Sequence, residues 1–307
     1  MVSDVVDAMA PGGDKPPSDG RPAERARPLT GLEAYRSELT RVAAHDERVV
    51  CLEAGPDGVE GHPFEAARPD RFFRLGSVEV AMVGMAKGLA VAGFRPFVST
   101  FAPHRETENL DLTIGYLSAG ATVIAPYEGA PLDFAALRRV PGLILASPYG
   151  EAETRAVVRV AAQLGRPHYI RIGRGTRYVS LPREGPGLPM VNWESEGAPP
   201  WPCLVSAGET GTALALAARR AAPMLGHAHL VYLSGAPLAA AAERVAARHS
   251  RLVVVGGYAP DGGLAQELAA LLPGCEVVGV PLGHGGRTGA AEVTAVLEAA
   301  GLAGPRG

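Results

Sequence analysis

Short apolar runs alternate with helical patterns along most of the chain. In the first half these runs predict buried strands at residues 49–54, 96–101, 121–127, 143–148 and 168–173. Residues 77–92 are almost wholly apolar, and residues 151–165 show the three-to-four-residue period of an amphipathic helix. Strands that alternate with helices are typical of a parallel sheet covered by helices on both faces.

The pattern breaks at residues 174–202, which are rich in glycine and proline and carry no long period, so we expect a linker there. A second alternation follows, with strands predicted at 203–208, 229–234, 251–257 and 275–282. Helices are expected at 210–225, 237–249, 262–272 and 288–300. The chain is therefore predicted to be α/β, with two doubly wound domains and mainly parallel sheets, at residues 29–173 and 203–307.

Composition adds limits to this picture. Residues 1–28 are dominated by proline, glycine and charge, which predicts a disordered tail. The net charge is −3, and no basic stripe suggests nucleic acid or an anionic membrane as a partner. The three cysteines lie far apart, and there is no signal peptide pattern or membrane-spanning apolar run. We expect a soluble protein in the cytoplasm.

Several common catalytic motifs are missing from the sequence. We find no G-x-G-x-x-G after the first strand, no P-loop, no H-E-x-x-H, no Cys/His cluster and no G-x-S-x-G. The absence of these motifs argues against a Rossmann dehydrogenase, a P-loop NTPase, a zinc enzyme and an α/β-hydrolase. We also expect no metal site in this chain.

One carboxylate stands out in the apolar helix predicted at 77–92. If Ser77 caps this helix, Glu79 lies at its second position, where a carboxylate is favoured by the helix dipole. That structural role would be sufficient if the side chain were exposed. Glu79 instead shares a face with Met82 and Val83, and a buried carboxylate needs a partner or a raised pKa. The sequence offers no basic residue three or four positions later, so the partner is expected from a ligand or another chain.

The segment "RFFRLGSVEVAMVGMAKGLA" resembles the pattern around the catalytic glutamate of the transketolase family, R-F-x-D-x-G-I-A-E-Q-x-M-x-G-x-A-x-G-L-A. Residues 137–175 are similar to the end of that family's pyrimidine-binding domain. Residues 208–221 and 253–268 look like its C-terminal domain. The resemblance covers about residues 29–300. It implies a thiamine diphosphate pyrimidine-binding domain at 29–173, followed by a transketolase C-terminal domain at 203–307.

The family's pyrophosphate-binding domain has no counterpart here, because the G-D-G motif with a later asparagine pair is missing. The resemblance therefore implies the C-terminal subunit of a split transketolase. A separate N-terminal subunit would bind the diphosphate and Mg²⁺, thiamine diphosphate would be shared at the interface, and the assembly would be an α2β2 heterotetramer.

The resemblance also assigns site residues. Glu79 would hydrogen-bond N1′ of the aminopyrimidine and favour the imino tautomer that removes the thiazolium C2 proton. Phe101 matches the first aromatic residue that packs on this ring, and His104 replaces the second. Substrate contacts are expected from His104, Arg105, Tyr127, Glu128, His284 and Arg287. The alternatives are a solvated loop for His104 and Arg105, and a plain strand–helix turn at 281–289.

The chain departs from its family in ways that concern the substrate. Ile114 stands where the family has an arginine, and the loop after residue 127 is short and lacks the family's histidines. We therefore expect transfer of a two-carbon ketol unit on a non-standard substrate in specialised metabolism. Two alternatives stay open: the β subunit of a 2-oxo-acid dehydrogenase or carrier-protein transferase, and a non-catalytic stabilising partner.

Overall fold

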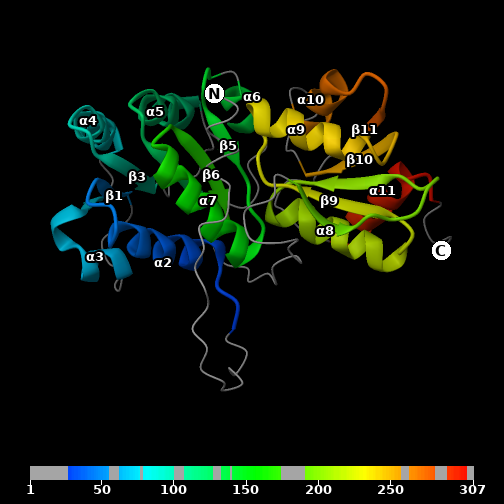
Figure 1. Ribbon diagram of the computed structural model, residues 1–307, viewed down its shortest axis with the longest axis horizontal. Helices are drawn as coiled ribbons and strands as arrows, with labels where there is room; N and C mark the ends of the chain where they lie inside the picture. Colours follow the sequence, from blue (N-terminus) through cyan, green and yellow to red (C-terminus); the bar gives the residue numbers. More distant parts are fainter. Residues whose placement is uncertain are drawn as a thin grey trace.

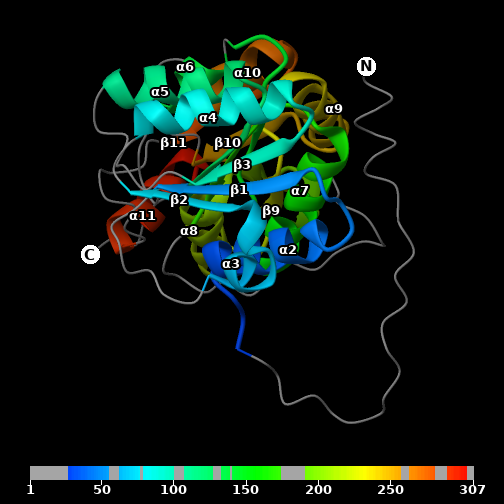
Figure 2. The ribbon, with the colours of Figure 1, turned by 90° about the vertical axis from the view of Figure 1, so that its left-hand side faces the viewer.

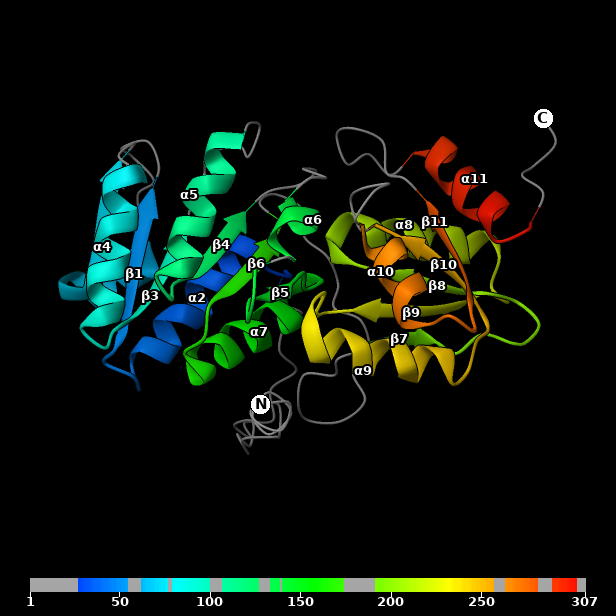
Figure 3. The same ribbon diagram turned by 90° about the horizontal axis from the view of Figure 1, so that it is seen from above.

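The computed structural model contains two α/β domains, each with its own sheet (Figures 1 and 3). It describes residues 27–54, 62–76, 79–99, 107–126, 133–138, 140–173, 191–256, 263–280 and 289–302. The predicted fold class is confirmed. No helix in these ranges is long and apolar enough to cross a membrane.

The first sheet has six strands in the order β2-β1-β3-β4-β6-β5, and all of its pairs are parallel. Its strands are β1 (Val49–Ala54), β2 (Phe72–Gly76), β3 (Arg95–Ser99), β4 (Thr122–Pro126), β5 (Ile144–Ala146) and β6 (His168–Ile172). The helices are α2 (Gly31–Ala43), α3 (Pro63–Ala67), the short 3₁₀ helix η1 (Pro69–Arg71), α4 (Glu79–Val91), α5 (Thr107–Ser118), α6 (Asp133–Leu137) and α7 (Gly150–Leu164).

The helices of this domain cover both faces of the sheet. Helices α4 and α5 lie on one face, and α2 and α7 lie on the other (Figure 2). Side chains of β1 alternate accordingly, because successive residues of a strand point to opposite faces. Leu52 belongs to the core that includes Met82 of α4, whereas Cys51 belongs to the core that includes Tyr35 of α2.

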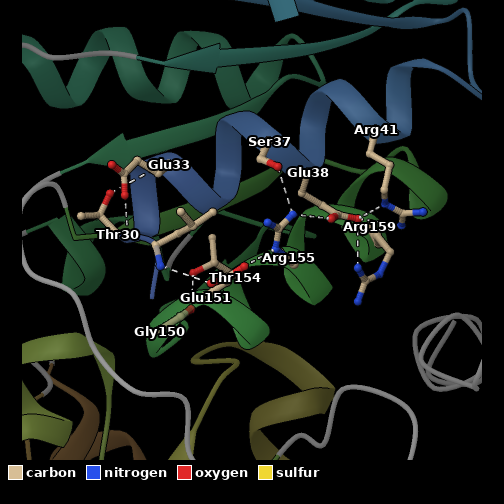
Figure 4. A network of polar contacts seen from close by, with 11 residues as sticks. Thr30, Glu33, Ser37, Glu38, Arg41, Gly150, Glu151, Thr154, Arg155 and Arg159 are labelled. Carbon is tan, nitrogen blue, oxygen red and sulfur yellow. Dashed lines mark hydrogen bonds and ion pairs between the residues drawn. The ribbon is translucent and has the colours of Figure 1, made fainter. Parts of the chain in front are cut away.

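Helices α2 and α7 are also joined by a polar network centred on a buried carboxylate (Figure 4). Glu38, 1% exposed, accepts hydrogen bonds from Arg41 at 2.7 Å, Arg159 at 2.9 Å and Arg155 at 3.1 Å. Burial works against the charge of Glu38, but Arg41 and Arg159 hold its pKa below the ordinary value. The network therefore holds the two helices to each other.

The second sheet has the order β11-β10-β8-β9-β7 and is parallel except at its β7 edge. Its strands are β7 (Val191–Ser195), β8 (Cys203–Ser206), β9 (Gly226–Leu230), β10 (Arg251–Val255) and β11 (Glu276–Val280). Helices α8 (Gly208–Ala221) and α11 (Ala290–Ala299) lie on one face, and α9 (Gly235–Ala246) and α10 (Leu264–Leu271) lie on the other (Figure 3).

Two of the differences from the sequence-based prediction concern the second sheet. Strand β7 lies within residues 174–202, which were expected to be only a linker, and it pairs antiparallel with β9. Val191, Asn192 and Trp193 are buried there, so pairing and burial stabilise this polar segment as an edge strand. The predicted domain boundaries themselves stay a prediction.

The strand predicted at 229–234 is the second difference. Strand β9 starts at Gly226 and ends at Leu230, and the following residues turn to the other domain. The Ser147 N–H donates to the Val231 carbonyl at 2.9 Å, and the Leu233 N–H donates to the Leu145 carbonyl at 2.9 Å. Residues 226–230 thus form a strand of the second sheet, and residues 231–233 hydrogen-bond to the first domain beside β5.

Candidate active site

The first sheet presents one common carboxyl edge, formed by strand ends that are aligned in register. Glu53 of β1 lies opposite Arg74 of β2 and Ser99 of β3, and Ala54 lies opposite Gly76. Open parallel sheets bind their ligands in the crevice outside the carboxyl ends of the strands. This edge is therefore the natural place for a site.

Helix α4 starts beside this edge. Strand β2 ends at Gly76, and Glu79 is the first residue of α4. The structure thus places the predicted catalytic residue at the ligand edge and at a helix N-terminus, where backbone N–H groups stabilise negative charge. Ser77, the predicted cap, and the side chain of Glu79 lie outside the described part of the structure.

The faces of α4 correct one expectation. A helix as apolar as α4 is expected to be buried on most sides, and Met82 and Ala86 are fully buried. Val80 and Val91, however, are 75% and 82% exposed in this single chain. A Cβ added at Gly84 or at Gly88 would meet no atom within 4 Å. Helix α4 therefore carries apolar side chains that the described part of this chain leaves exposed.

A second carboxylate near the same edge was not predicted as part of a site. Glu53 is 2% exposed and accepts a hydrogen bond from Arg36. The His62 Nδ1 accepts from the Phe64 N–H at 3.2 Å, which leaves the ring proton on Nε2, 3.3 Å from Glu53 Oε2. Burial lowers the pKa of His62 to about 3, so this ring is neutral. The Glu53 carboxylate is engaged within the fold, which indicates a structural role.

The remaining predicted site residues follow the ends of three strands. Strands β3, β4 and β11 end at Ser99, Pro126 and Val280. Phe101, His104, Arg105, Tyr127, Glu128, His284 and Arg287 come after these ends and lie outside the described residues. Their roles stay predictions.

Two further findings concern the chemistry that the described residues offer. Ile114, at the position of the family's arginine, packs against the apolar core and presents no charge. The described part of the chain contains no group of three or more histidine, cysteine, aspartate or glutamate residues that could hold a metal ion.

Known proteins resemble this chain in sequence. It is 31% identical over 183 residues to 1-deoxy-D-xylulose-5-phosphate synthase 1 of Geobacter metallireducens, which covers 55% of this chain and 29% of that protein. It is 28% identical over 265 residues to the 1-deoxy-D-xylulose-5-phosphate synthase of Nitratidesulfovibrio vulgaris, which covers 79% of this chain and 41% of that protein. The chain thus spans less than half the length of these relatives.

Solved structures share its fold. A structure described as "Split gene transketolase, inactive beta4 tetramer" matches with a TM-score of 0.75 and 24% identity, over 90% of this chain and 99% of that chain. The transketolase of Campylobacter jejuni matches with a TM-score of 0.63 and 15% identity, over 92% of this chain and 46% of that chain.

A family model supplies the assignment that the fold alone does not. The model for the transketolase pyrimidine-binding domain matches residues 27–177, the range that holds the first sheet and the start of α4. The family model therefore assigns residues 27–177, just under half of the chain, to a transketolase pyrimidine-binding domain.

Proposed function

We propose that the chain is the C-terminal subunit of a split, thiamine-diphosphate-dependent transketolase-like enzyme that transfers a two-carbon ketol unit. The observation that carries this proposal is the position of Glu79, at the N-terminus of α4 and at the carboxyl edge of a transketolase pyrimidine-binding domain. The match to nearly the whole length of a split-gene transketolase chain supports the subunit assignment.

Thiamine diphosphate would supply an electron sink for carbanion chemistry when it is bound. The role proposed for Glu79 is to hold a proton at its carboxyl group against N1′ of the aminopyrimidine. The N-terminus of α4 favours the ionised carboxylate, whereas cover by a second chain would favour the protonated form. A carboxyl group poised between these effects can share a proton at neutral pH. Phe101 and His104 are proposed to contact the same ring.

The exposed face of α4 supports the proposal of a partner. Val80 and Val91 are exposed, and Gly84 and Gly88 leave room for close approach of another surface. We propose that an N-terminal pyrophosphate-binding subunit, which would hold most of the Mg²⁺ ligands, covers this face in an α2β2 heterotetramer.

The substrate proposed is non-standard and belongs to specialised metabolism, because Ile114 provides no cation where the family has an arginine. His104, Arg105, Tyr127, Glu128, His284 and Arg287 are the proposed substrate contacts. The names of the relatives give one specific product to look for, and a donor and acceptor screen should include 1-deoxy-D-xylulose 5-phosphate among its products.

The test of the mechanism is Glu79→Gln in the assembled enzyme. We expect the variant to assemble and bind thiamine diphosphate, but to lose exchange of the cofactor C2 proton, measured by NMR in heavy water. Glu65→Gln is the matched control, because Glu65 is a half-exposed carboxylate paired with Arg74. If Glu79→Gln exchanges the C2 proton as fast as the wild type, Glu79 does not have the proposed role.

The test of the interface is Gly84→Leu. A Cβ here meets no atom of its own chain within 4 Å, and leucine replaces a poor helix former, so we expect the variant to be at least as stable as the wild type. We expect it to fail to assemble with the N-terminal subunit in analytical ultracentrifugation. Ala270→Leu adds a leucine to an exposed position of α10 and should assemble normally. Normal assembly of Gly84→Leu would exclude this face of α4 from the interface.

A further inference from the structure

Glu153, near the start of α7, is a buried carboxylate at the boundary between the two domains, and it is 1% exposed. The Tyr149 N–H donates to Glu153 Oε2 at 2.7 Å, which ties the side chain to the first turn of its own helix. The Asn192 amide donates to Glu153 Oε1 at 2.9 Å, and Asn192 belongs to β7 of the second sheet. A single carboxylate of the first domain is therefore hydrogen-bonded to the second domain at a buried position.

The same carboxylate also contacts the neighbouring strand of the second sheet. Glu153 Oε2 lies 3.0 Å from Nε2 of His229 in β9, and Asn192 lies opposite His229 in the β7–β9 ladder. The other ring nitrogen of His229 lies 2.8 Å from Thr212 Oγ1 of α8, which orients the ring. Burial opposes the charge of Glu153, but His229 and the hydrogen bonds to the carboxylate hold its pKa below the ordinary value. An ionised Glu153 thus spans two strands of the second sheet.

A second buried carboxylate crosses the domain boundary in the opposite direction. Glu209, at the start of α8, is 6% exposed. A Cβ added to Gly173 would clash with the Glu209 carboxylate, and one added to Gly31 would lie 3.1 Å from Glu209 Oε1. This carboxylate therefore packs against glycine backbone of the first domain, where residues without side chains permit the close approach.

The docking brings the ligand edges of the two sheets towards each other. Strand β6 ends at Ile172, next to Gly173, and strand β8 ends at Ser206, just before α8. Strands β8, β10 and β11 are parallel, so their carboxyl ends share one edge of the second sheet. The proposed substrate contacts His284 and Arg287 follow the end of β11 in the sequence. The orientation of the second domain therefore decides which part of this edge faces the first sheet.

The main-chain hydrogen bonds between the domains that are described above lie along one short segment. Val231 and Leu233 are two residues apart beside β5, so their bonds define a line about which the second domain could turn. Asn192 lies on a different strand, β7. Its hydrogen bond to the Glu153 carboxylate resists such a rotation, because a charge-assisted hydrogen bond is stronger than a neutral one.

We propose that Glu153 is a positioning residue, which fixes the second domain so that the carboxyl edge of its sheet completes the substrate site at the edge of the first sheet. This inference rests on the proposed transferase function and gives the second domain a part in holding the substrate. Glu153 acts through Asn192 and His229 rather than on the reacting atoms. Its loss should therefore weaken substrate binding and leave proton removal at the Glu79 site intact.

The first test measures domain orientation in the full chain without its partner. Nitroxide labels at Gln163→Cys in α7 and Ala270→Cys in α10, both exposed positions, report the distance between the domains by pulsed electron paramagnetic resonance. The background carries Cys275→Ser, because the two other cysteines are buried. We expect a single narrow distance distribution that broadens or shifts in Asn192→Ala and in Glu153→Gln. Asn192→Ala is the cleaner variant, since it leaves the first domain unchanged.

The second test measures catalysis by the assembled enzyme, with hydroxypyruvate as the ketol donor and CO₂ release as the signal. In Asn192→Ala and Glu153→Gln we expect KM for hydroxypyruvate to rise about tenfold, while kcat and exchange of the cofactor C2 proton stay within about twofold of the wild type. A role confined to stability would lower the free energy of unfolding and leave KM unchanged. Glu151→Gln is the matched control, because Glu151 lies on the same turn of α7 and binds Arg155 and the Leu29 N–H of its own domain.

The possible results separate this role from the proposed function. Distance distributions that match the wild type in both variants, or KM values within about twofold of it in both, would overturn the positioning role. Equal effects in Glu151→Gln would also overturn it, because the described contacts of that carboxylate stay within the first domain. A wild-type assembly that exchanges no C2 proton or consumes no hydroxypyruvate would refute the proposed ketol transfer, and the substrate role of Glu153 would fall with it.

Discussion

Buried neutral histidines should make this fold sensitive to mild acid. His62, His168 and His227 are at most 1% exposed. Burial lowers their pKa values from 6.5 to about 3, about 4 and about 3. Below pH 6.5 the unfolded chain binds protons at these rings and the folded chain does not. Stability is therefore fully present above pH 6.5 and falls as the pH decreases towards 4.

The magnitude follows from linkage. Each histidine contributes a slope of up to about 1.4 kcal/mol per pH unit once the pH is below its unfolded value. At pH 5.5 the three together should lower the free energy of unfolding by about 4 kcal/mol relative to pH 7.5. Carboxylates with lowered pKa, such as Glu38 and Glu153, do not add to this loss, because they stay ionised in both states over this interval. A loss of this size is a large share of a typical domain's stability.

The assay is urea denaturation at pH 7.5, 6.5 and 5.5, with His168→Asn beside the wild type. The His168 Nδ1–H donates to the Arg166 carbonyl at 2.7 Å, and an asparagine amide can replace that donor without titrating. We expect His168→Asn to remove about a third of the pH dependence. His45→Asn, at an exposed position, controls for the substitution. Free energies of unfolding at pH 7.5 and 5.5 that agree within about 1 kcal/mol would refute the reasoning.

Three further substitutions test packing and buried charge, each by urea denaturation. A Cβ at Gly173 would lie 1.6 Å from Glu209 Oε2, so Gly173→Ala should lower the free energy of unfolding by about 1–3 kcal/mol. In a Glu209→Ala background the same substitution should cost far less. An equal loss in both backgrounds would contradict this contact. Glu38→Gln should lower the free energy of unfolding by about 1–3 kcal/mol at pH 7, because the buried arginines lose their charged partner. The difference from the wild type should shrink as the pH falls below 4. A difference that stays constant with pH would contradict a charged Glu38. Met82→Ala should cost about 2–5 kcal/mol, because Met82 is fully buried, whereas a cost below about 1 kcal/mol would mean that α4 is loosely packed.

The strands that sequence predicted well are those buried on both faces. Strands β1, β4 and β6 are mostly apolar and rich in β-branched residues, and the structure places them close to the predicted positions. Helix α2 and strand β7 were missed for different reasons. Helix α2 carries a capping box between Thr30 and Glu33 that sequence analysis could have used. Strand β7 is short and polar, and its pairing with β9 depends on residues far away in the sequence.

Local and long-range signals also differ between the candidate site and the buried polar contact that joins the two domains. Glu79 was proposed as a site residue because a local motif surrounds it, and its role stays a prediction. Glu153, Asn192, Thr212 and His229 come from four separate elements, and no spacing in the sequence indicates that they meet. The one available signal was the polar character of Asn192 and His229 in strands that pair in register. Buried polar networks of this kind need tertiary structure to be recognised.

Helix α4 shows what an apolar pattern does and does not report. Hydrophobic composition records the surface that is buried in the functional state, and that state can include another chain. In α4 the side chains of Met82 and Ala86 are buried by this chain, while Val80 and Val91 are left exposed. The exposed valines show that its own domain leaves part of the apolar surface of α4 uncovered. This exposed apolar surface lies on the helix that starts with Glu79. Under the proposed assembly, binding of the N-terminal subunit would therefore cover the surface and complete the site in the same step.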